Sequence, residues 1–172
     1  VGTLPMHTIM RMRSVEALLD SDVEAVFIST PHIFHLDYAE KAVRAGKHVF
    51  CEKPLCADEK EISRLAVLLE RTQAQKLVFS SCHPRRFDCV FESVKSARSG
   101  WVRDFGSVRE VVFHFFYHVP PDGWRTQDSL LLDHMNHEID LVNFLLGFNK
   151  VSLKKLWDGF DAYAVSGIRD DG

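Results

Sequence analysis

The chain has 172 residues, of which 46% are hydrophobic and 26% are charged, and 21 basic against 24 acidic residues give a net charge of −3. This composition excludes collagen, coiled coils and long disordered tracts, and the charge lacks the basic footprint of a nucleic-acid-binding protein. No apolar run approaches the roughly 18 residues of a membrane span, and the four cysteines form no C-x-x-C pair. We therefore expect a cytoplasmic protein with reduced thiols that acts without membrane or nucleic acid.

The first 82 residues alternate between helix and strand patterns. Apolar runs at 23–28, 48–51 and 77–79 are typical of short parallel strands, the first of them covered on both faces. Ser14 is the expected N-cap of a first helix. A second helix is indicated by an apolar face of Leu36, Ala39 and Val43 and by Gly46 at its C-terminal end. A third is indicated by the capping pair Asp58 and Glu61, followed by apolar residues at helical spacing, which are Ile62, Leu65, Ala66 and Leu69. Right-handed crossovers between such strands build a parallel, doubly wound α/β sheet.

The pattern changes near Cys82–Pro84, where we place a domain boundary. The expected elements beyond it are a helix from Phe87 to near Gly100, a long β-prone stretch at 108–118, a helix at 129–146 closed by Gly147, and strands at 151–157 and 162–168. One face of the β-prone stretch carries His114 and His118 among apolar residues, which indicates an antiparallel strand with one side towards solvent or a site.

The helix expected at 129–146 carries the most informative polar pattern. An apolar stripe runs along one face of this helix. A different face carries polar residues, which are Asp133, Asn136, His137 and Asp140. A carboxylate one turn before a His can orient the imidazole as a general base, although a solvated helix face explains the same spacing. The spacing of His134, His137 and Glu138 matches no zinc motif, so we expect no metal site.

Two further candidate sites directly follow predicted strands. Ligands of open α/β sheets bind at the carboxyl ends of strands, and partial desolvation there can tune the amine of Lys53 for proton chemistry. Taken alone, an ordinary surface loop explains the motif after the second strand better than a site does, and it explains the motif after the first strand equally well. The motifs are Glu52-Lys53-Pro54 after the second strand and Thr30-Pro31-His32, with His35, after the first.

Taken together, these motifs resemble the glucose–fructose oxidoreductase, inositol dehydrogenase and rhizopine catabolism (Gfo/Idh/MocA) family. The matching segments, in family order, are 23–31, 45–55, Arg86-Phe87 and the D-x-x-x-H-x-x-D pattern of 133–140. The resemblance implies an oxidoreductase that uses NAD or NADP on a sugar, polyol or nucleotide-linked sugar, as a homo-oligomer when intact. It also implies a partial Rossmann domain over 1–82 and part of an α+β substrate and oligomerisation domain, with a largely antiparallel sheet, over 83–172.

The resemblance assigns roles to individual residues. Lys53 would lie beside the nicotinamide and hydrogen-bond the reacting hydroxyl, and His137 would take the hydroxyl proton as hydride leaves carbon. Asp133 would bind substrate hydroxyls or orient His137. The cofactor cleft would be lined or shaped by Thr30, Pro31, His35 and Glu52.

Two departures from the family pattern are visible. Ser129-Leu130 occupy the region where members usually carry a Gly pair, and residues 1–13 lack the glycine-rich turn that cradles a pyrophosphate. The residue that selects NAD or NADP normally comes from the same early region. We therefore expect a fragment truncated at both ends and inactive by itself; the alternative to an oxidoreductase is a non-catalytic, ligand-sensing or regulatory member of the same fold.

Overall fold

The computed structural model describes residues 10–56, 58–106, 108, 110–113, 130–147, 151–158 and 163–169. The chain divides into two compact units, Val1–Cys82 and His83–Gly172. In the described part of the chain, no helix is long and apolar enough to cross a membrane.

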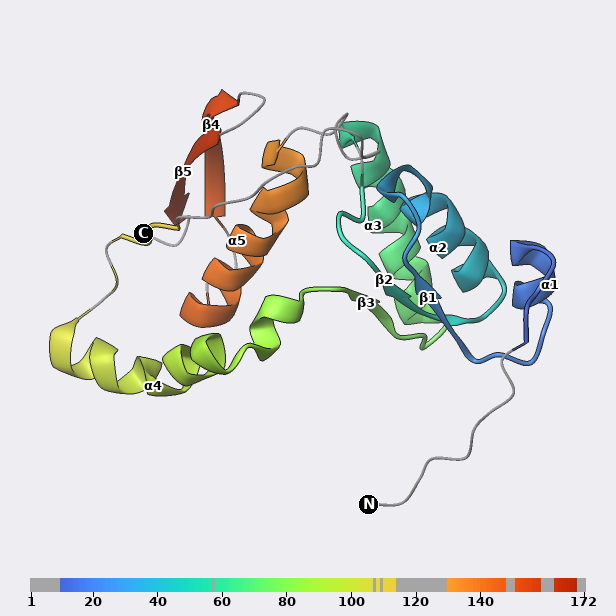
Figure 1. The fold of residues 1–172 in the computed structure, drawn as a ribbon, viewed down its shortest axis with the longest axis horizontal. Helices are drawn as coiled ribbons and strands as arrows, with labels where there is room; N and C mark the ends of the chain where they lie inside the picture. Colours follow the sequence, from blue (N-terminus) through green and yellow to red (C-terminus); the bar gives the residue numbers. More distant parts are fainter. Residues whose placement is uncertain are drawn as a thin grey trace, which may run out of the picture. The chain divides into compact units, whose positions relative to one another are not determined.

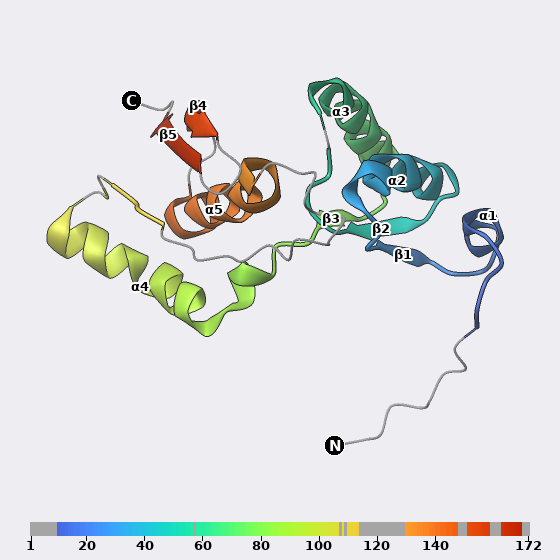
Figure 2. The ribbon, with the colours of Figure 1, turned by 45° about the horizontal axis from the view of Figure 1, so that its top comes forward.

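The first unit is built on a parallel sheet of three strands in the order β1-β2-β3 (Figure 1). The strands are β1 (Ala25–Ile28), β2 (His48–Cys51) and β3 (Phe79–Ser81), and the helices are α1 (Val15–Leu19), α2 (His35–Arg44) and α3 (Glu59–Ala74). A consecutive strand order with right-handed crossovers puts α2 and α3 on the same face of the sheet, as Figure 2 shows. The predicted parallel α/β arrangement is confirmed.

Side chains of this sheet alternate between a covered and an open face. Val49 and Cys51 are buried in the core with residues of α2 and α3, such as Val43 and Leu68. On the opposite face, Phe27 and Phe50 are 57% and 43% exposed, and their ring centroids lie 5.2 Å apart. The prediction that the first strand is covered on both faces is therefore wrong for the described residues, because both crossover helices pack on one side.

The helix ends follow local hydrogen-bond chemistry, as the sequence predicted. The Ser14 hydroxyl accepts from the Ala17 amide at 3.1 Å, and the Asp58 carboxylate accepts from the Glu61 amide at 3.0 Å. At the end of α2, Gly46 has a φ of +72°, and its amide donates to the Val43 carbonyl at 3.0 Å. The next amide, of Lys47, donates to the carbonyl of Ala42, which completes a Schellman motif.

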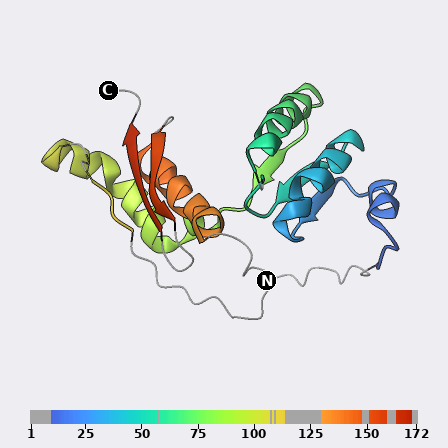
Figure 3. The same cartoon turned by 90° about the horizontal axis from the view of Figure 1, so that it is seen from above.

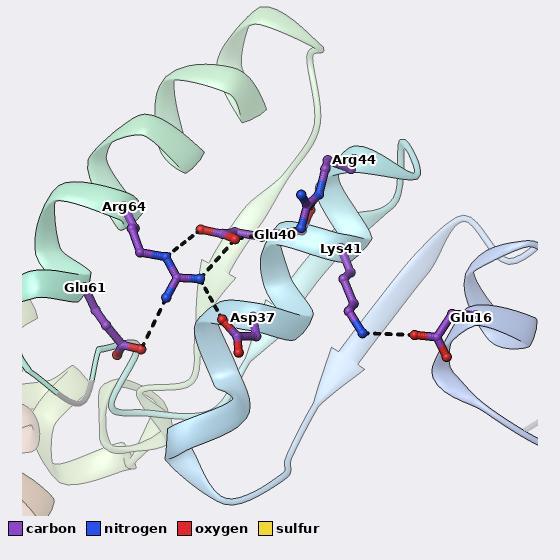
Figure 4. A network of polar contacts seen from close by, with 7 residues as sticks. All are labelled: Glu16, Asp37, Glu40, Lys41, Arg44, Glu61 and Arg64. Atoms are coloured by element: carbon purple, nitrogen blue, oxygen red, sulfur yellow. Dashed lines mark hydrogen bonds and ion pairs between the residues drawn. The ribbon is translucent and has the colours of Figure 1, made fainter.

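The buried face of α3 differs from the predicted one. Leu68 and Thr72 are buried, whereas Ile62 and Leu69, which we expected inside, are exposed. Ion pairs also link α3 to its neighbour: Figure 4 shows the guanidinium of Arg64 against carboxylates of α2. The pairs of this network are Arg64 with Asp37, Glu40 and Glu61, Arg44 with Glu40, and Lys41 with Glu16.

In the described part of the second unit, two helices pack against each other and two strands form an antiparallel pair (Figure 3). Its elements are the 3₁₀ helix η2 (Pro84–Phe87), α4 (Cys89–Phe105), α5 (Leu130–Leu146), β4 (Val151–Asp158) and β5 (Tyr163–Arg169). The helix predicted to end near Gly100 continues to Phe105 and ends at Gly106, whose φ is +86°. A single Gly lowers helix propensity but does not remove a backbone hydrogen bond, so α4 passes through it.

Residues 108 and 110–113 are described without regular structure, so the predicted strand does not begin at Val108; its remainder, 114–118, lies outside the described residues. The predicted helix at 129–146 is confirmed as α5, and Gly147 follows it with a φ of +67°. The two late strands are also confirmed, as the antiparallel pair β4 and β5.

Candidate functional site

The first candidate cluster lies where β1 and β2 end. Ile28 and Cys51 are register partners in these parallel strands, and the Glu52 amide donates to the Ile28 carbonyl at 2.8 Å. Parallel strands finish at the same edge of a sheet, so the turns that carry Thr30-Pro31 and Lys53-Pro54 are neighbours. This is the edge at which open α/β sheets bind ligands.

His35 joins the two turns at this edge. Its side chain is 1% exposed. The ring Nε2 lies 2.7 Å from the Thr30 carbonyl oxygen, and Nδ1 lies 2.8 Å from that of Pro54. The ring that the sequence placed along the cofactor cleft is thus enclosed, with both nitrogens directed at backbone.

The Thr30 side chain, unlike that of His35, has a polar atom without a hydrogen-bond partner among the described residues. This atom is the hydroxyl oxygen, and it is buried. A buried hydroxyl costs free energy unless it is paired, so an unpaired one at a ligand-binding edge is available to a polar ligand group. Pro31 follows directly, with a φ of −54° and a ψ of 140°, and leads into the short 3₁₀ helix His32–Phe34.

Glu52 and Lys53 continue directly from β2. The Lys53 side chain is half-buried, its amide donates to the Glu52 carboxylate at 3.3 Å, and its peptide bond to Pro54 is cis. The same carboxylate hydrogen-bonds the thiol of Cys82, so burial and then Glu52 raise the pKa of Cys82. Burial, followed by the charge of Glu52, raises the pKa of Cys51 to about 12. Both thiols are therefore neutral at physiological pH.

The second candidate cluster lies on α5. His137 is half-buried there. Asp133 stands one turn earlier in the same helix, and its side chain lies outside the described residues. Within the described residues, no group of three or more His, Cys, Asp or Glu side chains is arranged to hold a metal ion.

An ion-pair cluster that sequence reasoning missed fixes α5 within its unit. Asp140 is buried, and both of its carboxylate oxygens accept from the guanidinium of Arg86, one of them from Nε at 2.7 Å. This pairing raises the pKa of Arg86. The guanidinium also lies 5.6 Å from the centroid of Phe144, one turn further along α5. Arg86 therefore holds two successive turns of the helix.

A second pair lies beside this one. Arg85 Nη1 is 3.4 Å from a carboxylate oxygen of the buried Glu138, and His83 Nδ1 is 3.8 Å from Asp140 Oδ2. These contacts join residues more than 50 positions apart, so helical periodicity alone contains no sign of them. The available signal was the presence of both Arg86 and Asp140 in the segments that resemble the family.

The structure thus brings Thr30, Pro31, His35 and Lys53 to one sheet edge in the first unit, with Glu52 beside them. His137 and Asp133 lie on one helix of the second unit.

Comparison with known proteins adds a decisive observation. Residues 6–80 match the model of an oxidoreductase family with an NAD-binding Rossmann fold, Gfo/Idh/MocA. Inositol 2-dehydrogenase from Rhizobium meliloti (strain 1021) is 32% identical over 148 residues, which are 83% of this chain and 42% of that protein. The chain belongs to the Gfo/Idh/MocA family.

Other Gfo/Idh/MocA relatives agree with this. The 1,5-anhydro-D-fructose reductase of Ensifer adhaerens is 32% identical over 77% of this chain and 41% of that protein. An NAD-binding protein from Listeria innocua, of known crystal structure, superposes with a TM-score of 0.65 at 28% identity, over 84% of this chain and 44% of that one. The chain therefore spans less than half the length of each of these relatives. The predicted Rossmann fold is confirmed, and the predicted nicotinamide cofactor, NAD or NADP, is confirmed at the level of the family.

Proposed function

We propose that this protein is an NAD(P)-dependent oxidoreductase that transfers hydride between nicotinamide and a hydroxyl or carbonyl of a sugar, polyol or nucleotide-linked sugar. The observation that carries the proposal is the position of Lys53, half-buried directly after β2 at the ligand-binding edge of a Rossmann sheet. The relatives named inositol 2-dehydrogenase and 1,5-anhydro-D-fructose reductase support the substrate class. The proposal includes a cytoplasmic, homo-oligomeric enzyme.

The residues at the sheet edge fit a nicotinamide cofactor. The unpaired, buried hydroxyl of Thr30 offers a hydrogen bond to a polar group of the cofactor, and Pro31 gives this edge a fixed backbone. Glu52 is held against the Lys53 amide and the Cys82 thiol, so it shapes the edge rather than reaching away from it. When bound, the nicotinamide supplies or accepts the hydride.

The chain's own residues then handle orientation and one proton. The ammonium of Lys53 donates a hydrogen bond to the reacting oxygen of the substrate and stabilises the negative charge that develops there. The imidazole of His137 takes the hydroxyl proton during oxidation and returns it during reduction. Asp133, one turn before His137, orients that ring or binds a further substrate hydroxyl.

We assign these roles to two partial domains. Residues 1–82 would supply Lys53 and the cofactor edge as part of a Rossmann domain. Residues 83–172 would supply His137 and Asp133 as part of a substrate and oligomerisation domain with a largely antiparallel sheet.

The test is steady-state turnover of the complete gene product, including any sequence that flanks residues 1–172. Oxidation of myo-inositol and related polyols with NAD or NADP is followed by the absorbance of the reduced nicotinamide. Lys53→Ala should lower kcat by at least about 100-fold, the scale of a lost acid–base or electrostatic group. The matched control is Lys60→Ala, which removes an exposed lysine in the first turn of α3 and should leave kcat unchanged.

Two results would contradict the proposal. Unchanged turnover in Lys53→Ala would remove Lys53 from the catalytic role. Cofactor binding without hydride transfer across a broad panel of sugars and polyols would favour a ligand-sensing protein of the same fold.

A further inference from the structure

His35 occupies a position that the proposed chemistry does not explain. Its ring is buried and so does not reach a surface where a ligand could contact it. Its two nitrogens lie 2.7 and 2.8 Å from the carbonyl oxygens of Thr30 and Pro54. The first carbonyl belongs to the turn after β1 and the second to the turn after β2. The last backbone hydrogen bond between these strands runs from the Glu52 amide to Ile28. Beyond it, the His35 ring joins the two turns.

Hydrogen-bond chemistry fixes what the ring must do. A carbonyl oxygen only accepts, and a neutral imidazole donates from one nitrogen only. In a neutral ring, one nitrogen lone pair would therefore face an oxygen lone pair at hydrogen-bonding distance in a buried site. Rotating the ring by half a turn would put carbon atoms at both contacts, so it gives no better arrangement. Both contacts are hydrogen bonds only when both nitrogens carry protons.

The surroundings bear on the charge that this requires. His35 begins α2, and a helix N-terminus disfavours positive charge, but this effect is weak compared with two charge-assisted hydrogen bonds. The two carboxylates that follow His35 in α2 pair with arginines: Asp37 with Arg64, and Glu40 with Arg64 and Arg44. Glu52, at the end of β2, accepts from the Lys53 amide. Burial also disfavours a charged ring, so double protonation depends on the two carbonyl oxygens, which face the ring nitrogens at 2.7 and 2.8 Å.

We propose that His35 is a positioning residue, whose ring donates from both nitrogens and fastens the turn after β1 to the Lys53-Pro54 turn, so that Lys53 keeps its place at the sheet edge. The inference deepens the proposed function and rests on it only for the catalytic meaning of Lys53. The link itself is a property of residues 30–54 and is measured without turnover.

The first measurement is the ring protonation of His35 in the 172-residue chain, by long-range nitrogen–proton NMR at about pH 7. Both ring nitrogens of His35 should give the pattern of protonated nitrogen. His48 is a built-in control, because its Nδ1 accepts from the Val78 amide at 2.8 Å and so must carry a lone pair. A lone-pair nitrogen on His35 would overturn the proposal.

The second measurement is amide hydrogen exchange in His35→Phe, which keeps a planar ring but has no donor. Exchange at Glu52 should be at least about 10-fold faster, with a shifted Lys53 amide signal, while Val49, which bonds Val78 on the far side of β2, should not change. His35→Gln retains an N–H donor, so its exchange rate at Glu52 should lie between those of the unsubstituted chain and His35→Phe. Equal acceleration at Val49 and Glu52, or no acceleration, would reduce His35 to a packing residue. An enzyme without turnover but with the expected NMR pattern would refute the proposed function alone.

Discussion

Replacing Asp140 by Asn tests the ion pair that holds α5. The substitution keeps the shape of the side chain and removes its charge, so it isolates the electrostatic part of the contact with Arg86. Breaking a fully buried ion pair costs about 3–5 kcal/mol, because one charge stays desolvated. An exposed pair contributes only about 0.2–1 kcal/mol.

The structure places this pair between the two limits. The Asp140 side chain is 9% exposed, but that of Arg86 is 42% exposed, so its guanidinium returns to water when the carboxylate is lost. The coupling energy between the two residues should therefore be about 1–2 kcal/mol. Arg86→Met is the partner substitution, since it keeps an apolar side chain over Phe144.

Tryptophan fluorescence during urea unfolding measures this coupling, because Trp101, Trp124 and Trp157 all belong to the second unit. The single and double variants form a double-mutant cycle. Arg103→Met is the control: Arg103 pairs with Asp104 on an exposed surface, and the midpoint should not move. A coupling energy below about 0.5 kcal/mol would refute the view that burial of Asp140 makes the pair stronger than a surface contact.

Two other substitutions of glycine should act in opposite directions on the free energy of unfolding. Gly46→Ala should lower it by about 1–2 kcal/mol, because the φ of +72° disfavours any L side chain even though the added Cβ meets nothing within 4 Å. Gly100 lies in the middle of α4 and also has nothing within 4 Å of an added Cβ, so Gly100→Ala should raise it by about 0.5–1 kcal/mol. Urea titration followed by circular dichroism measures both, and a neutral Gly46→Ala would contradict the strain. Alkylation at about pH 8 should modify the exposed Cys89 and spare Cys51, whose thiol is buried and has a pKa of about 12, and equal rates by mass spectrometry would contradict that burial. The pKa of the Cys51 thiol is about 12 in the folded chain and has its ordinary value of about 9 in the unfolded chain. The contribution of this thiol to stability is therefore complete below about pH 9 and is lost as the pH rises towards about 12. A Cys51→Val variant should show a smaller fall in urea midpoint over this window.

The sequence predicted the features of this fold that depend on neighbours in the chain. Caps such as Ser14 and Asp58, and the left-handed residue Gly46, act through hydrogen bonds within a few positions, so their residue types are sufficient. The strands were visible as short apolar runs between helical patterns. The end of α4 was missed because Gly100 weakens a helix without ending it, whereas Gly106 adopts a positive φ.

Features that depend on distant partners were not predictable in the same way. Arg64 of α3 pairs with carboxylates of α2, and Asp140 of α5 pairs with Arg86. Neither pairing is visible in the local pattern around these residues. The sequence identified His35 as part of the cofactor edge, but its distance to the Pro54 carbonyl depends on how α2 returns over the sheet. For the candidate site, motifs therefore predicted which residues gather at the strand ends, and the fold determines which of them remain available to a ligand.

The alternation along β2 has a consequence for how substitutions accumulate in this protein. Phe50 lies on the open face of the sheet, whereas its neighbours Val49 and Cys51 belong to the core under α2 and α3. Exchange of Phe50 for a polar β-former would thus remove a smaller fraction of buried apolar area than the same exchange one position away, which would also leave a cavity or an unpaired polar group. Mutational tolerance should change with every residue along this strand, with a period of two.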